Sequence, residues 1–233
     1  MQTASMQYPI NAFIPANQFA EYLLVAVPAP ELHDKILFEQ QVFDQQYQQR
    51  NQGKAKLHIE VAGFQAKEEM EPTLLRWMHR IFSSQQAFSV PLSNYSGIPA
   101  DSIYLRVPSS QPFQQLGQAL EPLNDYIKTC DCPSIRVNLK PNLPIARKLN
   151  ADTYLKAMMD YSSRSFHEIF EVRELVLLRR KHLFDPYTQV NKFVLQPAWC
   201  SKSICLWWLR FIFASNQANG QSDCGNWDPV SGI

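Results

Sequence analysis

Glycine is scarce in this sequence, and no glycine pattern that binds nucleotide phosphates is present. There are 7 glycines among 233 residues, no Gly-x-Gly-x-x-Gly occurs, and Gly53-Lys54 is followed by Ala55 rather than by Ser or Thr. The phosphate loops of nucleotide kinases and of dinucleotide-binding domains need such glycines, because their backbone must approach the phosphate closely. The sequence therefore excludes both of these loop types.

Long apolar runs are also missing. The longest apolar burst, residues 204–214, is about 11 residues long and includes Arg210, whereas a membrane-spanning helix needs roughly 18 or more. Residues 1–20 carry no Lys or Arg and contain two prolines, unlike the charged start and continuous apolar stretch of a signal peptide. We therefore predict a cytoplasmic protein that does not enter a membrane.

Neither charge nor cysteine content indicates a specialised class. The formal net charge is +1, so no global field draws the chain to nucleic acid, and any phosphate binding needs a local basic patch. The 5 cysteines are an odd number, and Cys130-Asp131-Cys132 lacks the spacing of a zinc knuckle or a redox pair. We expect no disulfide framework and a structural or incidental role for the cysteines.

The apolar pattern predicts a chain that alternates between strands and helices. Apolar residues make up 45% of the sequence and charged residues 18%, as in ordinary soluble domains. Strands are predicted over 22–27, 56–64, 87–92, 102–107, 140–147, 166–178 and 192–195. Helices are predicted from Pro28 onward, over 68–82, over 112–127, and over 153–162 with Asp152 as the cap. The second half roughly repeats the first, which predicts an α+β protein of two similar lobes with a groove between them.

Three segments are distinguished along the chain. Residues 1–19 form an N-terminal extension, 20–197 form the two-lobed domain, and 198–233 form a tail with four of the five Trp and three of the five Cys. No amphipathic period runs through the tail. Two interpretations stay open: an appendage that remains unfolded, or a partner-binding patch formed by the sequence WWLRFIF. The sequence does not fix an oligomeric state.

Two strand motifs occupy equivalent places in the two halves. KLHIEVAGF begins at Lys56 and KPNLPIARKL begins at Lys140, and their alignment makes His58 and Asn142 equivalent. Here the sequence resembles the 2H phosphoesterase superfamily, the 2'-5' RNA ligase or LigT-like family, whose signature is two copies of His-x-Thr/Ser. The stretches YLLVAVPAPELHDKI, AFSVPLSNYSGIPADSIYLRV and FHEIFEVRELVLLRR also resemble that family, so the likeness covers residues 20–197.

This resemblance implies a fold and a chemistry. The fold would be two pseudo-symmetric lobes of antiparallel sheet with flanking helices. The substrate would be a 2',3'-cyclic phosphate or a 2',5'-phosphodiester of RNA or a nucleotide. One imidazole takes a proton from the attacking oxygen while the other gives one to the leaving oxygen. A hydroxyl two residues further along the same strand face donates to the phosphate. This scheme requires no metal and no cofactor.

The chain departs from that signature at three of four positions. His58 fits the first histidine, but Glu60 replaces the first hydroxyl, Asn142 the second histidine and Pro144 the second hydroxyl, while Arg147 matches a basic residue often found after the second motif. Asn cannot exchange a proton near neutral pH, and loss of a general acid or base lowers the rate by a factor of about 10² to 10⁴. A carboxylate about 4 Å from a phosphate oxygen repels it by roughly 1 kcal/mol in water and 4 kcal/mol near a protein surface.

The resemblance therefore implies a degenerate site, with His58 and Asn142 at the catalytic positions and Glu60, Pro144 and Arg147 at the phosphate-binding positions. Other interpretations of single residues stay open. His58 could have a purely structural role. His58 and Glu60 could also act as two ligands of a metal ion, but the sequence shows no third ligand. Glu60 would alternatively pair with Lys56 or Arg147. The prolines of the second motif predict an edge strand. Arginines that could line a basic groove are Arg106, Arg136 and Arg147.

Three functions follow from these observations. The first is a phosphodiesterase or RNA ligase-type enzyme with impaired catalysis. The second is a non-catalytic module that binds a nucleotide, an RNA end or another anion in the same groove through His58, Asn142 and Arg147. The third is an interaction protein in which the tail binds a partner.

Overall fold

The computed structural model describes residues 19–48, 57–182 and 184–198. The elements all belong to one compact unit that ends at Gln196. The strands are β1 (Ala20–Ala26), β2 (Ile59–Ala66), β3 (Phe88–Ile98), β4 (Ser102–Arg106), β5 (Arg136–Val137), β6 (Asn142–Ala146), β7 (His167–Val172), β8 (Glu174–Arg180) and β9 (Thr188–Val194). The helices are α1 (Pro30–Gln46), α2 (Glu71–Phe82), α3 (Gln111–Ala119), α4 (Glu121–Thr129), α5 (Ala151–Ser162) and the short 3-10 helix η1 (Glu68–Met70).

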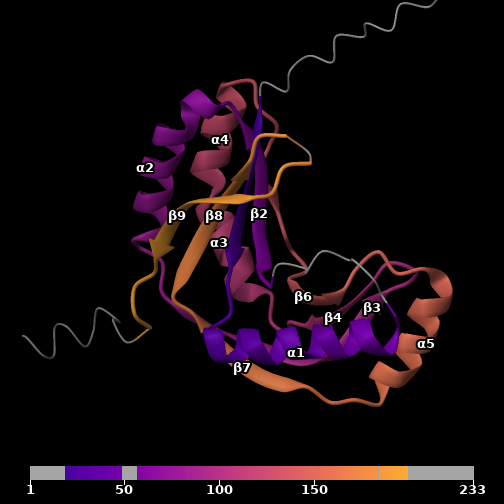
Figure 1. The fold of residues 1–233 in the computed structure, drawn as a ribbon. Helices are drawn as coiled ribbons and strands as arrows, with labels where there is room; N and C mark the ends of the chain where they lie inside the picture. The colour runs from indigo at the N-terminus through magenta and orange to yellow at the C-terminus, as the bar shows by residue number, and fades with distance from the viewer. Residues whose placement is uncertain (1–18, 49–56, 183, 199–233) are drawn as a thin grey trace, which may run out of the picture. The chain divides into compact units, whose positions relative to one another are not determined.

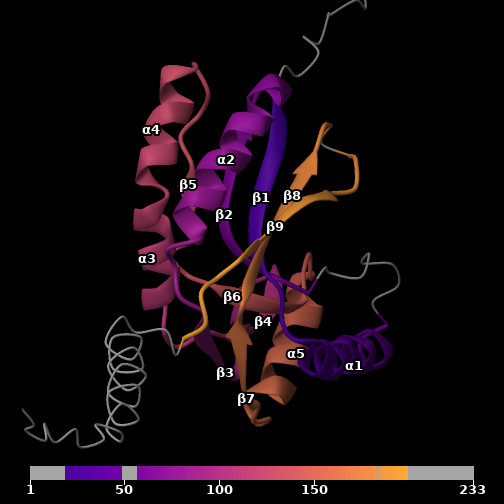
Figure 2. The ribbon, with the colours of Figure 1, turned by 90° about the vertical axis from the view of Figure 1, so that its left-hand side faces the viewer.

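The strands form two antiparallel sheets, which confirms the predicted α+β fold with two lobes. One sheet has the order β5-β2-β1-β8-β9 and the other β6-β4-β3-β7. Helices α2, α3 and α4 lie on one side of the five-stranded sheet, whereas α1 and α5 lie beside the four-stranded sheet (Figures 1 and 2). The two motif strands, β2 and β6, lie in different sheets, and β6 is an edge strand as its prolines predict.

The lobes do not correspond to the two halves of the chain. The five-stranded sheet begins with β1 and β2 and is completed by β8 and β9 from the C-terminal end of the described chain. The predicted single strand over 166–178 is wrong, because it divides at Arg173 into β7 of one sheet and β8 of the other. Arg173 is therefore the only residue between β7 of one sheet and β8 of the other.

Successive side chains of β1 alternate between the face of the sheet that packs on the main core and the opposite face. Tyr22 and Leu24 are fully buried within the main hydrophobic core, whereas Glu21 and Leu23, on the other face, are partly exposed. Val25 belongs to a small separate cluster on that other face, together with Val176 and Leu178. The face of the sheet that is turned away from the main core thus carries a small apolar cluster, and charged residues lie beside it.

Two predicted helix features are wrong for local reasons. The predicted helix over 112–127 is two helices, α3 and α4, that meet at Leu120. Pro122 has no amide hydrogen and its ring crowds the preceding turn, so a continuous helix is disfavoured there. The cap of α5 is Asn150 rather than Asp152, because the Asn150 side chain accepts a hydrogen bond from the Thr153 amide at 2.8 Å.

Two strands also differ from the prediction. β3 continues through the segment expected to form a turn and ends at Ile98, and Ala100 in the following turn has a φ of 53°. β5 was not predicted, since its two residues carry no periodicity; it pairs with β2 through Val137 opposite Ala62. The predicted tail and most of the N-terminal extension lie outside the described residues.

Helix α3 packs closely on β5 at Gly117. A Cβ added at Gly117 would lie 2.6 Å from Cγ1 of Val137, a side chain that is stiff because it is branched at Cβ. We expect Gly117→Ala to lower the free energy of unfolding by about 1–3 kcal/mol through overpacking, even though alanine favours helix. Urea denaturation measures the change.

Two further variants control for this prediction. Gln118→Ala, at an exposed position of the same helix, is expected to be close to neutral. Val137→Ala should restore part of the stability lost in Gly117→Ala, because it removes the atom that the new methyl group meets. A Gly117→Ala protein as stable as the Gln118→Ala control would contradict the close-packing argument.

Candidate functional site

A pocket of about 610 Å³ lies on the face of the five-stranded sheet that is turned away from the main core. Strands β1, β2, β5 and β8 contribute to it, and one residue comes from the end of the other sheet. Its lining residues are Glu21, Leu23, His58, Glu60, Ala62, Gly63, Arg136, Val137, Asn138, Arg147, Arg180 and Tyr187. The pocket therefore joins the two sheets, and five of its twelve lining residues are charged.

Three of the five predicted site residues reach this pocket. His58 immediately precedes β2, Glu60 lies within β2, and Arg147 follows β6; all three line the pocket. Asn142 and Pro144 are not among the lining residues. The Asn142 amide donates to the Lys140 carbonyl at 3.2 Å, and Pro144 is buried. The catalytic and phosphate-binding roles of these residues remain predictions.

Pro144 has a structural role in the packing of helix α1 against β6. Its carbonyl oxygen accepts a hydrogen bond from Nε2 of Gln40 at 3.1 Å, and Gln40 is one of the few buried polar residues in the described chain. This bond joins α1 to β6. The proline at the second hydroxyl position thus belongs to the packing between helix and sheet.

Glu21 and Arg180 form the tight ion pair of the pocket. They face each other across β1 and β8, and Nε of Arg180 lies 2.6 Å from Oε2 of Glu21, with Nη2 in contact with the same oxygen. The Arg180 guanidinium also covers the Tyr187 ring, 4.8 Å from its centroid. Burial, followed by the charge of Glu21 and a hydrogen bond to it, raises the pKa of Tyr187 to about 12. Glu21 is therefore engaged by both a cation and a hydroxyl.

Glu60 and Arg147 form a looser pair that spans the two sheets. Nη2 of Arg147 lies 3.8 Å from Oε1 of Glu60, and the two side chains are 49% and 41% exposed. The interpretation that Glu60 pairs with Arg147 is confirmed, whereas Lys56 lies outside the described residues. Arg136 has no ion pair within the described ranges. Arg136 and Arg147 are thus the guanidinium groups that an anion in this pocket can recruit.

Asn138 links the segment after β5 to β2, next to Glu60, through several hydrogen bonds. Its side chain donates to the Glu60 carbonyl at 3.0 Å, and its backbone amide donates to the Val61 carbonyl at 2.9 Å. Its Oδ1 accepts a hydrogen bond from the Lys140 amide at 3.1 Å. These bonds hold the connection that leaves β5 against β2, so that Arg136 and Glu60 keep their relative positions.

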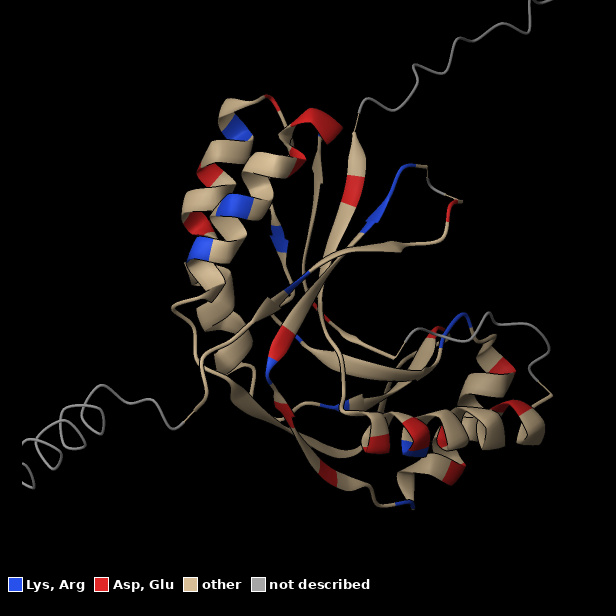
Figure 3. Cartoon of the chain, turned by 60° about the vertical axis from the view of Figure 1, so that its left-hand side comes forward, with Lys and Arg blue, Asp and Glu red and all other residues tan. Residues whose placement is uncertain are grey.

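Sequence reasoning missed Glu21, Arg180 and Tyr187. Glu21 meets Arg180 only because β1 pairs with β8, far away in the sequence. The available signals were a carboxylate within an otherwise apolar strand and the paired arginines at 179–180. Of the three arginines expected in a basic groove, Arg106 lies elsewhere and donates from Nε to the Ser93 carbonyl at 3.3 Å. Basic and acidic residues are interspersed over both lobes (Figure 3), in keeping with the small net charge.

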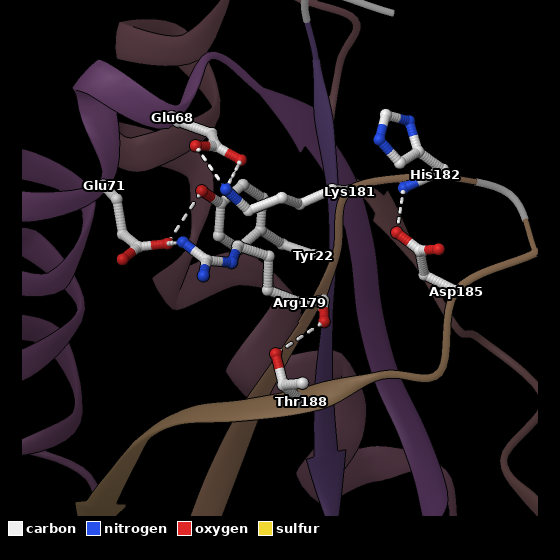
Figure 4. Close-up of polar contacts among 8 residues, drawn as sticks. All are labelled: Tyr22, Glu68, Glu71, Arg179, Lys181, His182, Asp185 and Thr188. Atoms are coloured by element: carbon white, nitrogen blue, oxygen red, sulfur yellow. Dashed lines mark hydrogen bonds and ion pairs between the residues drawn. The ribbon is translucent and has the colours of Figure 1, made fainter.

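A second charged cluster lies on the opposite face of the same sheet and has a structural role. Glu71, in the first turn of α2, accepts hydrogen bonds from the Tyr22 hydroxyl at 3.0 Å and from Arg179 at 2.8 Å (Figure 4). Lys181 pairs with Glu68 of η1 at 2.9 Å. Arg179 on β8 and Lys181 just after the strand lie in this cluster (Figure 4), whereas the intervening Arg180 lines the pocket on the other face. These contacts join α2 to the sheet.

The described residues contain neither a metal-binding cluster nor a membrane-spanning helix. No group of three or more His, Cys, Asp or Glu side chains in that part of the chain is arranged to hold a metal ion. None of the helices described has the length and apolar character needed to cross a membrane.

Comparison with known proteins places this geometry in a structural context. No protein-family model matches the sequence, and no curated protein matches it. E. coli LigT complexed with 3'-AMP matches with a TM-score of 0.57 and 16% identity, over 76% of this chain and 98% of that one. The protein TT0787 of Thermus thermophilus matches with a TM-score of 0.53 and 18% identity, over 76% and 99%.

A crystal structure described as a phosphoesterase gives a TM-score of 0.53 and 15% identity, over 76% of this chain and 98% of its own. At such identities a structural likeness establishes the fold. The chain has a LigT-like fold.

Proposed function

We propose that this protein binds a phosphate ester of a nucleotide or of an RNA end in the pocket between its two sheets. The observation that supports it most directly is the convergence of His58, Arg136 and Arg147 in one pocket of about 610 Å³. Guanidinium groups recognise phosphate through two parallel N–H donors, and an imidazole supplies a further donor. LigT, which shares the fold, has been crystallised with 3'-AMP and with phosphate, and this supports the same ligand class here.

We further propose that any hydrolysis of a 2',3'-cyclic phosphate or a 2',5'-phosphodiester is slow. A two-proton mechanism needs one group that accepts a proton and another that donates one. His58 can take one of these roles, but the amide of Asn142 can take neither near neutral pH. The best-supported function is therefore binding, with catalysis reduced by a factor of about 10² to 10⁴ relative to a site with two histidines.

Removal of the Arg147 charge is expected to weaken binding strongly. Arg147→Gln should raise the dissociation constant for 2',3'-cyclic AMP by about 10- to 100-fold, because a hydrogen bond to a charged group contributes roughly 1.5–3 kcal/mol. Isothermal titration calorimetry measures this change, and chromatography of the same samples measures hydrolysis. The matched control is Arg173→Gln, since Arg173 is 79% exposed and pairs with Glu171 outside the pocket.

The outcomes separate the two parts of the proposal. Binding that is lost in Arg147→Gln and kept in Arg173→Gln supports the pocket as the ligand site. Absence of both binding and turnover in the wild-type protein would contradict the proposed function. Fast turnover that disappears in His58→Ala would support the ligand class but contradict impaired catalysis, because one histidine would then suffice.

A further inference from the structure

Glu60 stands in the pocket where the ligand phosphate is expected to bind. It lies two residues after His58, lines the same pocket and contacts Arg147 at 3.8 Å across the gap between the sheets. This distance is at the limit of an ion pair and too long for a hydrogen bond. By contrast, Arg180 holds Glu21 at 2.6 Å. An anionic ligand can therefore recruit Arg147 from Glu60 far more readily than Arg180 from Glu21.

The charges that line the pocket set its electrostatic character. Arg136, Arg147 and Arg180 contribute three positive charges, and Glu21 and Glu60 contribute two negative charges, so the formal sum is +1 with His58 neutral. Glu21 and Arg180 neutralise each other. The remaining positive charge matches a ligand group with one negative charge. Without the Glu60 carboxylate the sum would be +2.

Phosphate esters differ in charge in a way that this pocket can detect. A diester or a cyclic phosphate carries one negative charge at neutral pH, whereas a terminal phosphate monoester carries about −1.5 to −2. When Arg147 pairs with the ligand phosphate instead of with Glu60, the Glu60 carboxylate lies beside the phosphate and has lost its ion-pair partner. The extra charge of a monoester then meets this carboxylate at short range, where the repulsion is reduced but not removed by solvent because Glu60 is partly exposed.

We infer that Glu60 is a charge filter, a specificity-determining residue that favours singly charged phosphate diesters and cyclic phosphates over doubly charged monoesters. This inference rests on the proposed function of the pocket. It also has a consequence for any residual turnover. Hydrolysis of a cyclic phosphate converts a singly charged ester into a monoester, so the filter would expel the product.

A matched pair of ligands tests the inference. 2'-Deoxyadenosine 3'-phosphate is a monoester, and its methyl ester is a diester that differs by one methyl group and one charge. Neither ligand has a 2'-hydroxyl group, so neither can cyclise. Titration calorimetry at neutral pH is expected to show that the wild-type protein binds the methyl ester about 10-fold more tightly.

Variants identify the residue responsible. Glu60→Gln, nearly isosteric and uncharged, should bring the affinity ratio to about 1 or reverse it, mainly by strengthening monoester binding about 10-fold. Arg147→Gln removes the partner of Glu60 and should weaken monoester binding more than diester binding. Asp125→Asn is the control, because this carboxylate on α4 is 72% exposed and lies outside the pocket; it should leave the ratio unchanged.

Two results would overturn the inference, and they can be told apart. If both ligands bind and Glu60→Gln leaves their ratio unchanged, the charge filter is wrong while the pocket remains a phosphate-ester site. If neither ligand binds to the wild-type protein or to any variant, the proposed function fails together with the filter. Thermal melting of each variant, compared with the wild type, shows whether a lost affinity reflects unfolding.

Discussion

Alkaline solution is expected to unfold this protein steeply as the pH rises above 10. Burial raises the pKa of Tyr161 to about 12, and burial together with Glu71 or Glu39 raises the pKa values of Tyr22 and Tyr95 further above the ordinary 10.0. All three side chains are almost completely buried, with exposed fractions of 0%, 0% and 8% for Tyr22, Tyr161 and Tyr95.

The sign of the effect follows from proton binding. Above pH 10 the unfolded chain loses phenolic protons that the folded chain keeps, so stability is complete below that pH and falls as the pH rises towards the folded pKa values. Each tyrosine contributes up to about 1.4 kcal/mol per pH unit in this window. Three of them together remove at most about 4 kcal/mol per pH unit, which is a large part of the roughly 5–15 kcal/mol that stabilises a typical domain.

Urea denaturation at a series of pH values measures this loss, and Tyr161→Phe isolates one contribution. The Tyr161 hydroxyl has no hydrogen-bond partner among the described residues, and its ring packs edge-on to Tyr95 at 4.8 Å between centroids. Phenylalanine keeps that packing. We expect unchanged or slightly higher stability at pH 7 and a shallower loss above pH 10. Identical pH profiles for the two proteins would show that Tyr161 does not titrate with unfolding.

A second imidazole at position 142 is expected to raise hydrolysis of 2',3'-cyclic AMP by about 10² to 10⁴ over the wild-type rate. The variant combines Asn142→His with Pro144→Thr and Glu60→Thr, which restores a proton-transferring group and both hydroxyls. Within the described part of the chain, the Asn142 side chain donates to the nearby Lys140 carbonyl, so an imidazole there replaces a local contact. The carbonyl at position 144 that accepts from Gln40 belongs to the backbone, and it is kept when threonine replaces proline.

Removal of His58 controls for this gain. His58→Ala in the restored variant should return the rate to the wild-type level, because both imidazoles are needed for the two proton transfers. Hydrolysis is followed by chromatography of the released monoester, with ligand binding measured in parallel. A restored variant that binds the ligand but stays at the wild-type rate would place position 142 outside the reacting geometry.

Much of the fold could be predicted from the sequence because it depends on local patterns. The apolar run of β1 and the periodicity of α2 are visible within a few residues, and the two strand motifs indicated both His58 and the two-lobed architecture. The crossing at Arg173 was not visible, since β7 and β8 both alternate and only tertiary pairing assigns them to different sheets.

The residues that line the candidate pocket could be predicted mainly where they belong to one of the two strand motifs. His58, Glu60 and Arg147 stand in or beside the two strand motifs and do line the pocket. Glu21 and Arg180 become neighbours through strand pairing, which no spacing in the sequence encodes. Tyr187 follows the turn between β8 and β9, and its place beside Arg180 depends on that hairpin.

The two short connections between the sheets also restrict how the lobes can move. Arg173 alone joins β7 to β8, and residues 138–141 join β5 to β6, where Asn138 is hydrogen-bonded to β2. Both sheets also share one hydrophobic core, which includes Tyr22 of the five-stranded sheet and Phe170 of the four-stranded sheet. Movement of one lobe against the other would open that close-packed core and pull on connections that have little slack. We therefore expect a ligand to meet a preformed pocket, with Asn138 and its neighbours already in place.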